Sequence, residues 1–148
     1  MNIKDISSNQ NQEDKMDTEG LLPCTIEEVG SCDCDCHGEV RIKIKDEYLT
    51  IYMSSDAAIN LAAASGQAEL PRPSSYDLIA AILQQCGGKV EGLAITDLKD
   101  GIFYGSLSVS HDGESQWYDC RPSDGMNIAI RCQAPIFVHP RVLMAANT

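Results

Sequence analysis

Two Asp-Gly pairs, Asp100-Gly101 and Asp112-Gly113, divide the second half of this sequence into three runs of strand-forming residues. Asp-Gly between apolar runs favours a two-residue hairpin turn, because both residues tolerate the positive φ angles that such turns require. The runs cover residues 90–98, 102–110 and 115–120. We therefore predict an antiparallel meander of three strands.

A second hairpin is predicted earlier in the chain. Apolar and polar residues alternate over 40–44 and again over 49–53, on either side of Lys45-Asp46-Glu47. Alternation with a period of two is typical of strands that bury one face, and the short link favours antiparallel pairing.

Three helices are predicted from capping residues that precede apolar stretches. The first follows Ser54 or Ser55 and closes at Gly66, the second follows Pro73, and the third opens at Pro122. A short strand over 134–138 and a last helical turn or two complete the chain. The order β-β-α-α-β-β-β-α-β-(α) does not alternate strictly, so we predict an α+β fold with a largely antiparallel sheet and helices packed on it.

The N-terminal part of the chain differs from the rest in composition. Residues 1–38 contain nine acidic residues against two lysines, a net charge of −7 out of −11 for the whole chain. They show no sustained apolar period, although a short patch over 21–26 could dock on the domain. We predict a disordered, cysteine-containing tail over 1–38 and one folded domain over 39–148.

Charge and hydropathy limit the classes of function. No basic stripe is present that would hold a phosphate backbone by charge alone, so tight non-specific nucleic-acid binding is not expected. No run approaches the roughly 20 apolar residues of a membrane span, and the first twenty residues lack a secretory signal. We expect a cytoplasmic protein with reduced thiols and no membrane partner.

Two similar helix starts carry the candidate site, Arg72-Pro73-Ser74-Ser75-Tyr76-Asp77 and Arg121-Pro122-Ser123-Asp124. Helix-start chemistry alone explains proline and aspartate at these positions. The functional interpretation is that arginines and helix N-termini bind phosphate, while aspartates hold a divalent cation that activates water. The candidate residues are Asp77, Asp97 and Asp124 for catalysis and Arg72, Arg121 and Ser123 for substrate binding.

From about residue 40 to 143 the chain resembles the bifunctional nuclease domain family. The resemblance rests on five blocks, which are Pro71-Arg72-Pro73 with Tyr76-Asp77-Leu78, residues 95–101, Phe103-Tyr104, residues 121–124 and residues 134–138. It implies a compact α+β fold and degradation of both DNA and RNA. The family usually has His where this chain has Tyr76, Glu where it has Ala57, and Ala where it has Gly125.

A cluster outside the resemblance, Cys32-Asp33-Cys34-Asp35-Cys36-His37, offers three thiolates and an imidazole. Such ligands bind soft ions such as Zn²⁺ or Cu⁺. The spacing is not that of ordinary zinc modules, so thiols in a flexible linker are the alternative. Cys86, Cys120 and Cys132 fall in apolar patterns and are expected in the core.

The first hypothesis is therefore a nuclease that acts on DNA or RNA with Mg²⁺ or Mn²⁺. The second is a non-catalytic binding or regulatory relative, which the departures at Tyr76 and Ala57 favour. A metal sensor that acts through Cys32, Cys34, Cys36 and His37 is a third. The sequence is compatible with a homo-oligomer and with a monomer.

Overall fold

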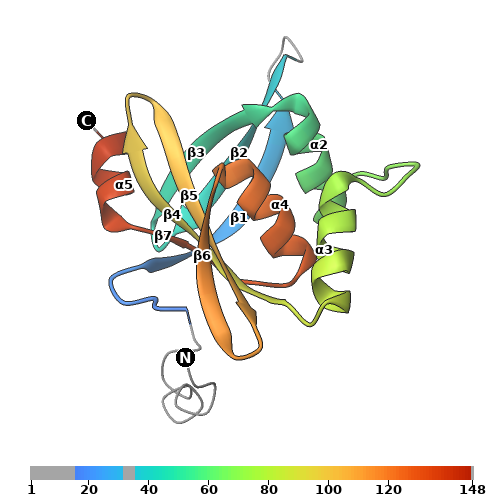
Figure 1. Cartoon of the computed structure of the whole chain (residues 1–148). Coiled ribbons are helices and arrows are strands. Elements are labelled where there is room, and N and C mark those ends of the chain that lie inside the picture. Colours follow the sequence, from blue (N-terminus) through green and yellow to red (C-terminus); the bar gives the residue numbers. More distant parts are fainter. Residues whose placement is uncertain (1–15, 32–35, 148) are drawn as a thin grey trace, which may run out of the picture.

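The computed structural model of the chain describes residues 16–31 and 36–147 and confirms the predicted α+β fold (Figure 1). The strands are β1 (Leu22–Ser31), β2 (His37–Ile44), β3 (Glu47–Ser54), β4 (Lys89–Lys99), β5 (Ile102–His111), β6 (Glu114–Cys120) and β7 (Ile136–Val138). The helices are α2 (Ser55–Ala64), α3 (Ser75–Gln85), α4 (Pro122–Arg131) and α5 (Pro140–Ala146).

The strands form one mostly antiparallel sheet of seven strands in the order β3-β2-β1-β7-β4-β5-β6. Both predicted hairpin systems are present, with β2 paired to β3 and β5 paired to both β4 and β6. Asp100 and Asp112 adopt φ angles of 52° and 51°, and the glycines that follow them also have positive φ. The two Asp-Gly pairs thus form the turns that were predicted from them. The prediction is specific because few other residue pairs tolerate this backbone conformation.

Strand β1 lies between the two halves of the sheet and joins them. It falls within residues 1–38, which were predicted to form a disordered tail. It pairs antiparallel with β2 and with β7, and β7 in turn runs parallel to β4. Only Cys24 of this strand is buried, so its side chains carry little apolar periodicity although its backbone bonds to both neighbours. A strand held mainly by its backbone gives a weak sequence signal, and within the described residues the sheet therefore starts at Leu22, inside the predicted tail.

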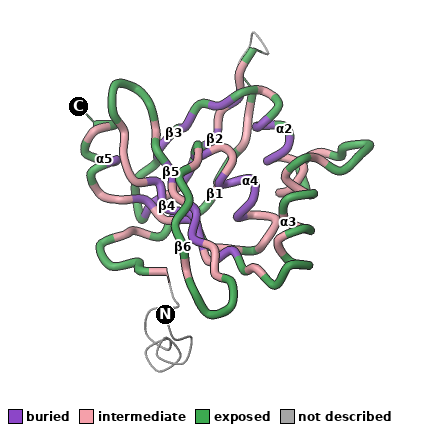
Figure 2. Tube along the Cα trace, in the orientation of Figure 1, coloured by how far each residue is buried: buried purple, intermediate pink, exposed green. Residues whose placement is uncertain are grey.

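The helices α2, α3 and α4 lie together on one side of the sheet, and α5 lies apart from them, packed beside β4 (Figure 1). The core is built from aliphatic side chains of β2, β3, β4, α2 and α4, and its largest fully buried members include Ile42, Ile51, Leu61, Leu93 and Met126. Figure 2 shows this burial along the central strands and α4, in contrast to the exposed outer part of α3 and much of β6.

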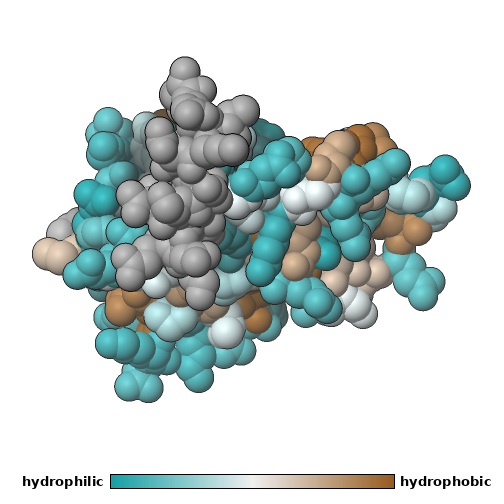
Figure 3. All heavy atoms as spheres, turned by 60° about the horizontal axis from the view of Figure 1, so that its bottom comes forward, coloured by the Kyte–Doolittle hydropathy of each residue, from teal (hydrophilic) through white to brown (hydrophobic). Residues whose placement is uncertain are grey.

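Helix α3 buries less than its apolar period predicted. Leu78 and Ile82 are 60% and 52% exposed, and no residue of this helix is fully buried. Figure 3 shows apolar residues gathered on the right of that view, the side on which α3 lies in Figure 1. Cys86 is likewise exposed rather than part of the core, because α3 packs on α4 only along its inner edge.

None of the helices in the described part of the chain is long and apolar enough to cross a membrane.

Candidate functional site

The first turns of α2, α3 and α4 meet around one cleft of about 550 Å³. Asp56 comes from the start of α2, Ser74 and Tyr76 come from the start of α3, and Asp124 comes from the first turn of α4. The loop before α3 adds Arg72 to the lining. Because unpaired backbone N–H groups and the positive end of the helix dipole face outward at each helix start, such a cleft favours anionic ligand groups.

Local sequence explains why each helix begins here. Ser54 caps α2 by accepting a hydrogen bond from Ala57 N, and Ser74 forms a reciprocal capping box with Asp77 at the start of α3. Helix α4 has Pro122 in its first turn and no side-chain cap at Arg121. Its acidic residue Asp124 is therefore available for other contacts.

Asp124 is the most heavily bonded carboxylate of the cleft. Arg121 donates from Nε to Oδ2 at 2.7 Å and from Nη2 to Oδ1 at 3.2 Å, and Tyr76 Oη donates to Oδ1 at 2.7 Å. Burial raises the pKa of Asp124, but the hydrogen bonds from Arg121 and Tyr76 and the Arg121 charge outweigh it and leave that pKa below its ordinary value. Asp124 is thus an anion whose orientation is fixed by two neighbours.

Tyr76 is the neighbour that bonds Asp124 from α3. Burial raises the pKa of its hydroxyl to about 12, with further contributions from the bond to Asp124 and the charges of Asp124 and Asp56. Tyr76 therefore stays protonated near neutral pH and acts as a hydrogen-bond donor, not as a base.

Asp77 does not line the cleft that Asp124 lines. Its Oδ2 accepts from Ser74 N and Ser74 Oγ at 2.7 and 2.9 Å, and its Oδ1 accepts from Arg131 Nε at 2.8 Å. The Ser74 backbone bond and the Arg131 bond lower the pKa of Asp77 to about 2. Asp77 therefore caps α3 and is bonded to Arg131 of α4.

Arg131 connects all three helices behind the cleft. Its side chain is only 8% exposed, and besides Asp77 it donates to Asn127 O, Asn127 Oδ1 and Asn60 O. Asn127 is fully buried and donates in turn to Ala57 O and Ser123 O. These bonds hold the helix starts in fixed relative positions.

Asn60 is a cleft residue that the sequence analysis missed. It lies one turn after Asp56 on α2, is 6% exposed, and donates from Nδ2 to Asp56 O at 2.9 Å. Its Oδ1 is buried and accepts no hydrogen bond from the described residues. A polar residue one turn after an acid, in an otherwise apolar helix, was the available signal.

The remaining candidates lie around the cleft or apart from it. The Arg121 side chain is 78% exposed, and with Ser123 it lines a neighbouring cleft of about 310 Å³. Asp97 pairs with Arg141 Nε of α5 at 3.3 Å and does not line the Asp124 cleft. Of the three proposed catalytic aspartates, only Asp124 lines it.

The cysteine cluster is described only in part. Cys32 and Cys34 lie outside the described residues. Cys36 is disulfide-bonded, which differs from the expected reduced thiols. Its Sγ lies 3.5 Å from His37 Nδ1, and the His37 ring packs edge-on against Tyr52. Within 16–31 and 36–147, no group of three or more His, Cys, Asp or Glu side chains is placed to share a metal ion.

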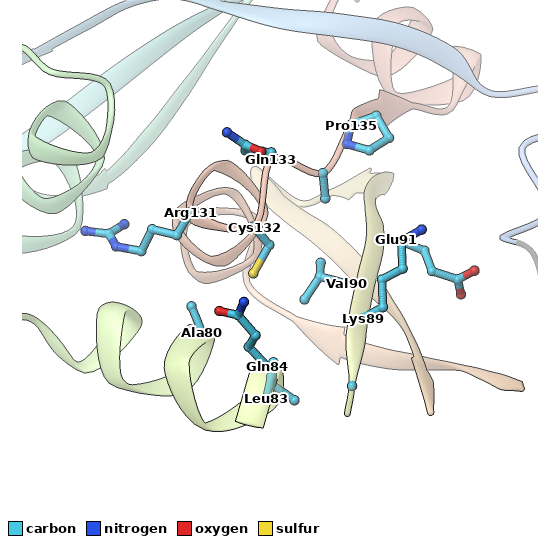
Figure 4. A pocket seen from close by; sticks show the side chains of 12 residues that line it. Ala80, Leu83, Gln84, Lys89, Val90, Glu91, Arg131, Cys132, Gln133 and Pro135 are labelled. Atoms are coloured by element: carbon cyan, nitrogen blue, oxygen red, sulfur yellow. The ribbon is translucent and has the colours of Figure 1, made fainter. Parts of the chain in front are cut away.

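A second cleft, of about 500 Å³, lies between α3, the end of α4 and β4 (Figure 4). Arg131 points away from it toward α3, and Glu91 is turned to the far side of β4, where it accepts from Ser108 and Ser115. Burial raises the pKa of Cys132, which makes its thiol a poor nucleophile. The lining carries no convergent set of reactive groups.

Comparison with known proteins connects the chain to one family. The family model described as the bifunctional nuclease domain matches residues 40–148. An uncharacterized protein of Mycobacterium tuberculosis is 34% identical over 102 residues, which is 69% of this chain and 60% of that protein.

Plant relatives are similar to the same part of the chain. Bifunctional nuclease 1 of Oryza sativa subsp. japonica is 30% identical over 112 residues, and bifunctional nuclease 2 of Arabidopsis thaliana is 28% identical over 109 residues. The matches cover 72% and 70% of this chain but only 34% and 33% of the two plant proteins.

Proposed function

Because this chain belongs to the bifunctional nuclease domain family, we propose that it hydrolyses phosphodiester bonds of DNA, RNA or both at the cleft between α2, α3 and α4. The observation that carries the proposal is the meeting of three helix starts around Arg72, Tyr76 and Asp124. The cytoplasm is the compartment that we propose for this activity.

Arg72 and Arg121 are the proposed phosphate contacts. Asp124 engages Arg121 through Nε and Nη2, and the exposed side chain leaves further guanidinium donors for a ligand. An arginine whose plane is fixed by a carboxylate loses less freedom when it binds a phosphate. Together with the helix N-termini, the two arginines would stabilise negative charge on a phosphate in the transition state.

A divalent cation, Mg²⁺ or Mn²⁺, is proposed as the cofactor, with Asp124 as its protein ligand. A carboxylate has about four lone-pair sites, and Arg121 and Tyr76 fill three of those on Asp124, so that about one stays available. Mg²⁺ commonly keeps several waters and binds one or two carboxylates plus substrate phosphates, so a single carboxylate fits. When bound, the cation would neutralise phosphate charge and lower the pKa of a bound water.

Within this mechanism the chain's own residues have separate roles. Tyr76 and Arg121 orient Asp124, and Asp124 in turn orients Arg121. Asp77 is proposed as a positioning residue through its bond to Arg131, and Asp97 is not needed at the cleft.

A non-catalytic binding relative is the second candidate function. The three hydrogen bonds that Asp124 accepts from Arg121 and Tyr76 favour it, because they weaken this carboxylate as a ligand and as a base. A metal-sensing role of Cys32, Cys34, Cys36 and His37 is a separate proposal, which requires reduction of the disulfide that Cys36 forms in this structure. The metal content of protein purified with reductant and without chelator tests it.

The deciding experiment is a cleavage assay on labelled single-stranded and duplex DNA and RNA with Mg²⁺, Mn²⁺ or chelator. We expect cleavage that needs the cation, is lost in Asp124→Asn and is kept in Asp112→Asn, an exposed turn residue. Equal cleavage by Asp124→Asn and wild type, both folded at the assay temperature, would exclude Asp124 and point to a contaminant. No cleavage by wild type, combined with its appearance in Tyr76→His, would support the non-catalytic alternative.

A further inference from the structure

The part of the cleft formed by α2 offers hydrogen-bond acceptors without donors of its own. Asn60 lines this cleft, and its Oδ1 is buried and has no donor among the described residues. Its Nδ2 is already used by Asp56 O, so turning the amide round would not satisfy both ends. Because native proteins rarely leave a buried acceptor unpaired, a ligand that brings N–H groups is indicated.

Asp56 places a second acceptor on the same face of α2. It precedes Asn60 by four residues, which puts both side chains on one side of the helix, and both line the cleft. No hydrogen bond or ion pair to the Asp56 carboxylate is found within 16–31 and 36–147. Asp56 is exposed, so both of its oxygens are open to a ligand.

Of the three hydroxyls in the lining, two already donate, and the third, that of Ser75, lies at an exposed position. Ser74 Oγ donates to Asp77 Oδ2, and Tyr76 Oη donates to Asp124 Oδ1. The walls beside Asp56 are apolar and consist of Ile59, Leu70, Pro71 and Pro73. An apolar slot with acceptors at one end suits a flat heterocycle that presents N–H donors on one edge.

We propose that this slot binds a guanine base of the nucleic-acid strand, with Asp56 and Asn60 as specificity-determining residues. Guanine carries N1–H and N2–H₂ side by side, so one carboxylate can accept from both, and Asn60 Oδ1 can accept the remaining amino hydrogen. Adenine and cytosine each place a ring acceptor beside their amino group, and uracil places carbonyls beside its N–H, so each would set an acceptor against Asp56. Arg72 contacts the phosphate of the same nucleotide.

The inference rests on the proposed function, since it names the substrate that the same cleft selects. It is tested by binding, which does not depend on turnover. The probes are 5′-GMP, IMP, AMP, CMP and UMP, measured with the full chain by calorimetry and by the shift in melting temperature. We expect GMP to bind about tenfold to a hundredfold more tightly than AMP, CMP or UMP, as for a good two-bond base contact. IMP, which lacks the N2 amine, should fall between them.

Variants assign the effect to the two acceptors. Asp56→Asn replaces one acceptor oxygen by a donor and should remove the preference for GMP over AMP, while Asp46→Asn in the β2–β3 turn should leave it unchanged. Asn60→Ala should lower GMP affinity and leave IMP affinity unchanged, because IMP has no amine for Asn60 to accept. Its melting curve shows whether the variant is folded, and Asp56→Asn, at an exposed position, tests the proposal independently of that result.

Three results would overturn the inference: equal affinity for the nucleotides, no binding of any of them, or a preference for GMP that survives Asp56→Asn. These results are distinguishable from failure of the proposed nuclease. GMP selectivity without cleavage would refute the nuclease and keep the base site, whereas cleavage without base preference would do the reverse.

Discussion

Tyr76 and Asp124, which are 48 positions apart in the sequence, are joined by a 2.7 Å hydrogen bond from the tyrosine hydroxyl to Oδ1 of the carboxylate. The bond connects the first turn of α3 to the first turn of α4. It means that a residue of α3 orients the acidic residue that α4 contributes to the cleft.

Tyr76→Phe removes this donor and keeps the ring. We expect the free energy of unfolding to fall by about 1.5 kcal/mol, because a hydrogen bond to a charged group contributes more than a neutral one and this one is partly buried. Urea denaturation measures the change. Tyr52→Phe, at an exposed position of β3, is the matched control and should be neutral. Equal effects of the two substitutions would show that the Tyr76–Asp124 bond adds nothing.

Arg131→Ala should be far more destabilising than Arg141→Ala. Removal of the buried Arg131 leaves Asp77 Oδ1, Asn127 Oδ1 and the carbonyls of Asn60 and Asn127 without this donor. Losing one partner of a buried charged pair typically costs about 3–5 kcal/mol, and because the Asp77 side chain is 43% exposed we expect a loss of about 2–3 kcal/mol. Arg141 also holds an aspartate and a carbonyl, but its side chain is 56% exposed, and exposed pairs contribute about 0–1 kcal/mol. Similar losses in the free energy of unfolding for Arg131→Ala and Arg141→Ala, measured by urea denaturation, would contradict the role of Arg131 in holding the three helices together.

Local chemistry made much of the fold predictable. The turns at Asp100 and Asp112 need residues that tolerate positive φ, and the helix starts at Ser54, Ser74 and Pro122 need capping or N1 residues, so each signal lies within a few positions. Strand β1 was not predicted, because it is stabilised by backbone pairing with β2 and β7 rather than by a row of buried side chains.

The site was only partly predictable for a related reason. The two helix starts with Arg72 and Asp124 could be found, because each motif is continuous in the sequence. The Arg131 network could not, since Arg131 bonds Asp77 and Asn60 across 54 and 71 positions. For the same reason Asp77 and Asp124 look equivalent in sequence, although one caps a helix and the other faces the cleft.

Acid should reveal the contribution of Asp77. Its pKa is about 2 in the folded chain against an ordinary value of 3.8, so its contribution to stability is complete above about pH 4 and is lost as pH falls through about 2. We therefore expect the stability difference between wild type and Asp77→Asn to be constant near neutral pH and to shrink between about pH 4 and pH 2. Urea denaturation at several pH values measures it, with Asp112→Asn as the control. A difference that does not depend on pH would show that Asp77 contributes through its size or its neutral contacts, not its charge.

Gly125→Ala tests how closely α4 packs on β4. Alanine is the better helix former by about 1 kcal/mol, so helix propensity alone predicts stabilisation. A Cβ at this position would, however, collide with Leu93 Cδ1 and come within 3.1 Å of Cys120 Sγ. Leu93 is fully buried and has little room to move, so we expect a net loss of about 1–3 kcal/mol in the free energy of unfolding.

The double variant Leu93→Val with Gly125→Ala identifies the cause. Shortening Leu93 removes the colliding methyl group, so the double variant should be more stable than the sum of the two single changes predicts. Additive losses would show that the collision is relieved elsewhere, and a stabilised Gly125→Ala would show that helix propensity outweighs packing at this position. Measured in urea, the three variants decide whether Leu93 is what requires glycine at position 125.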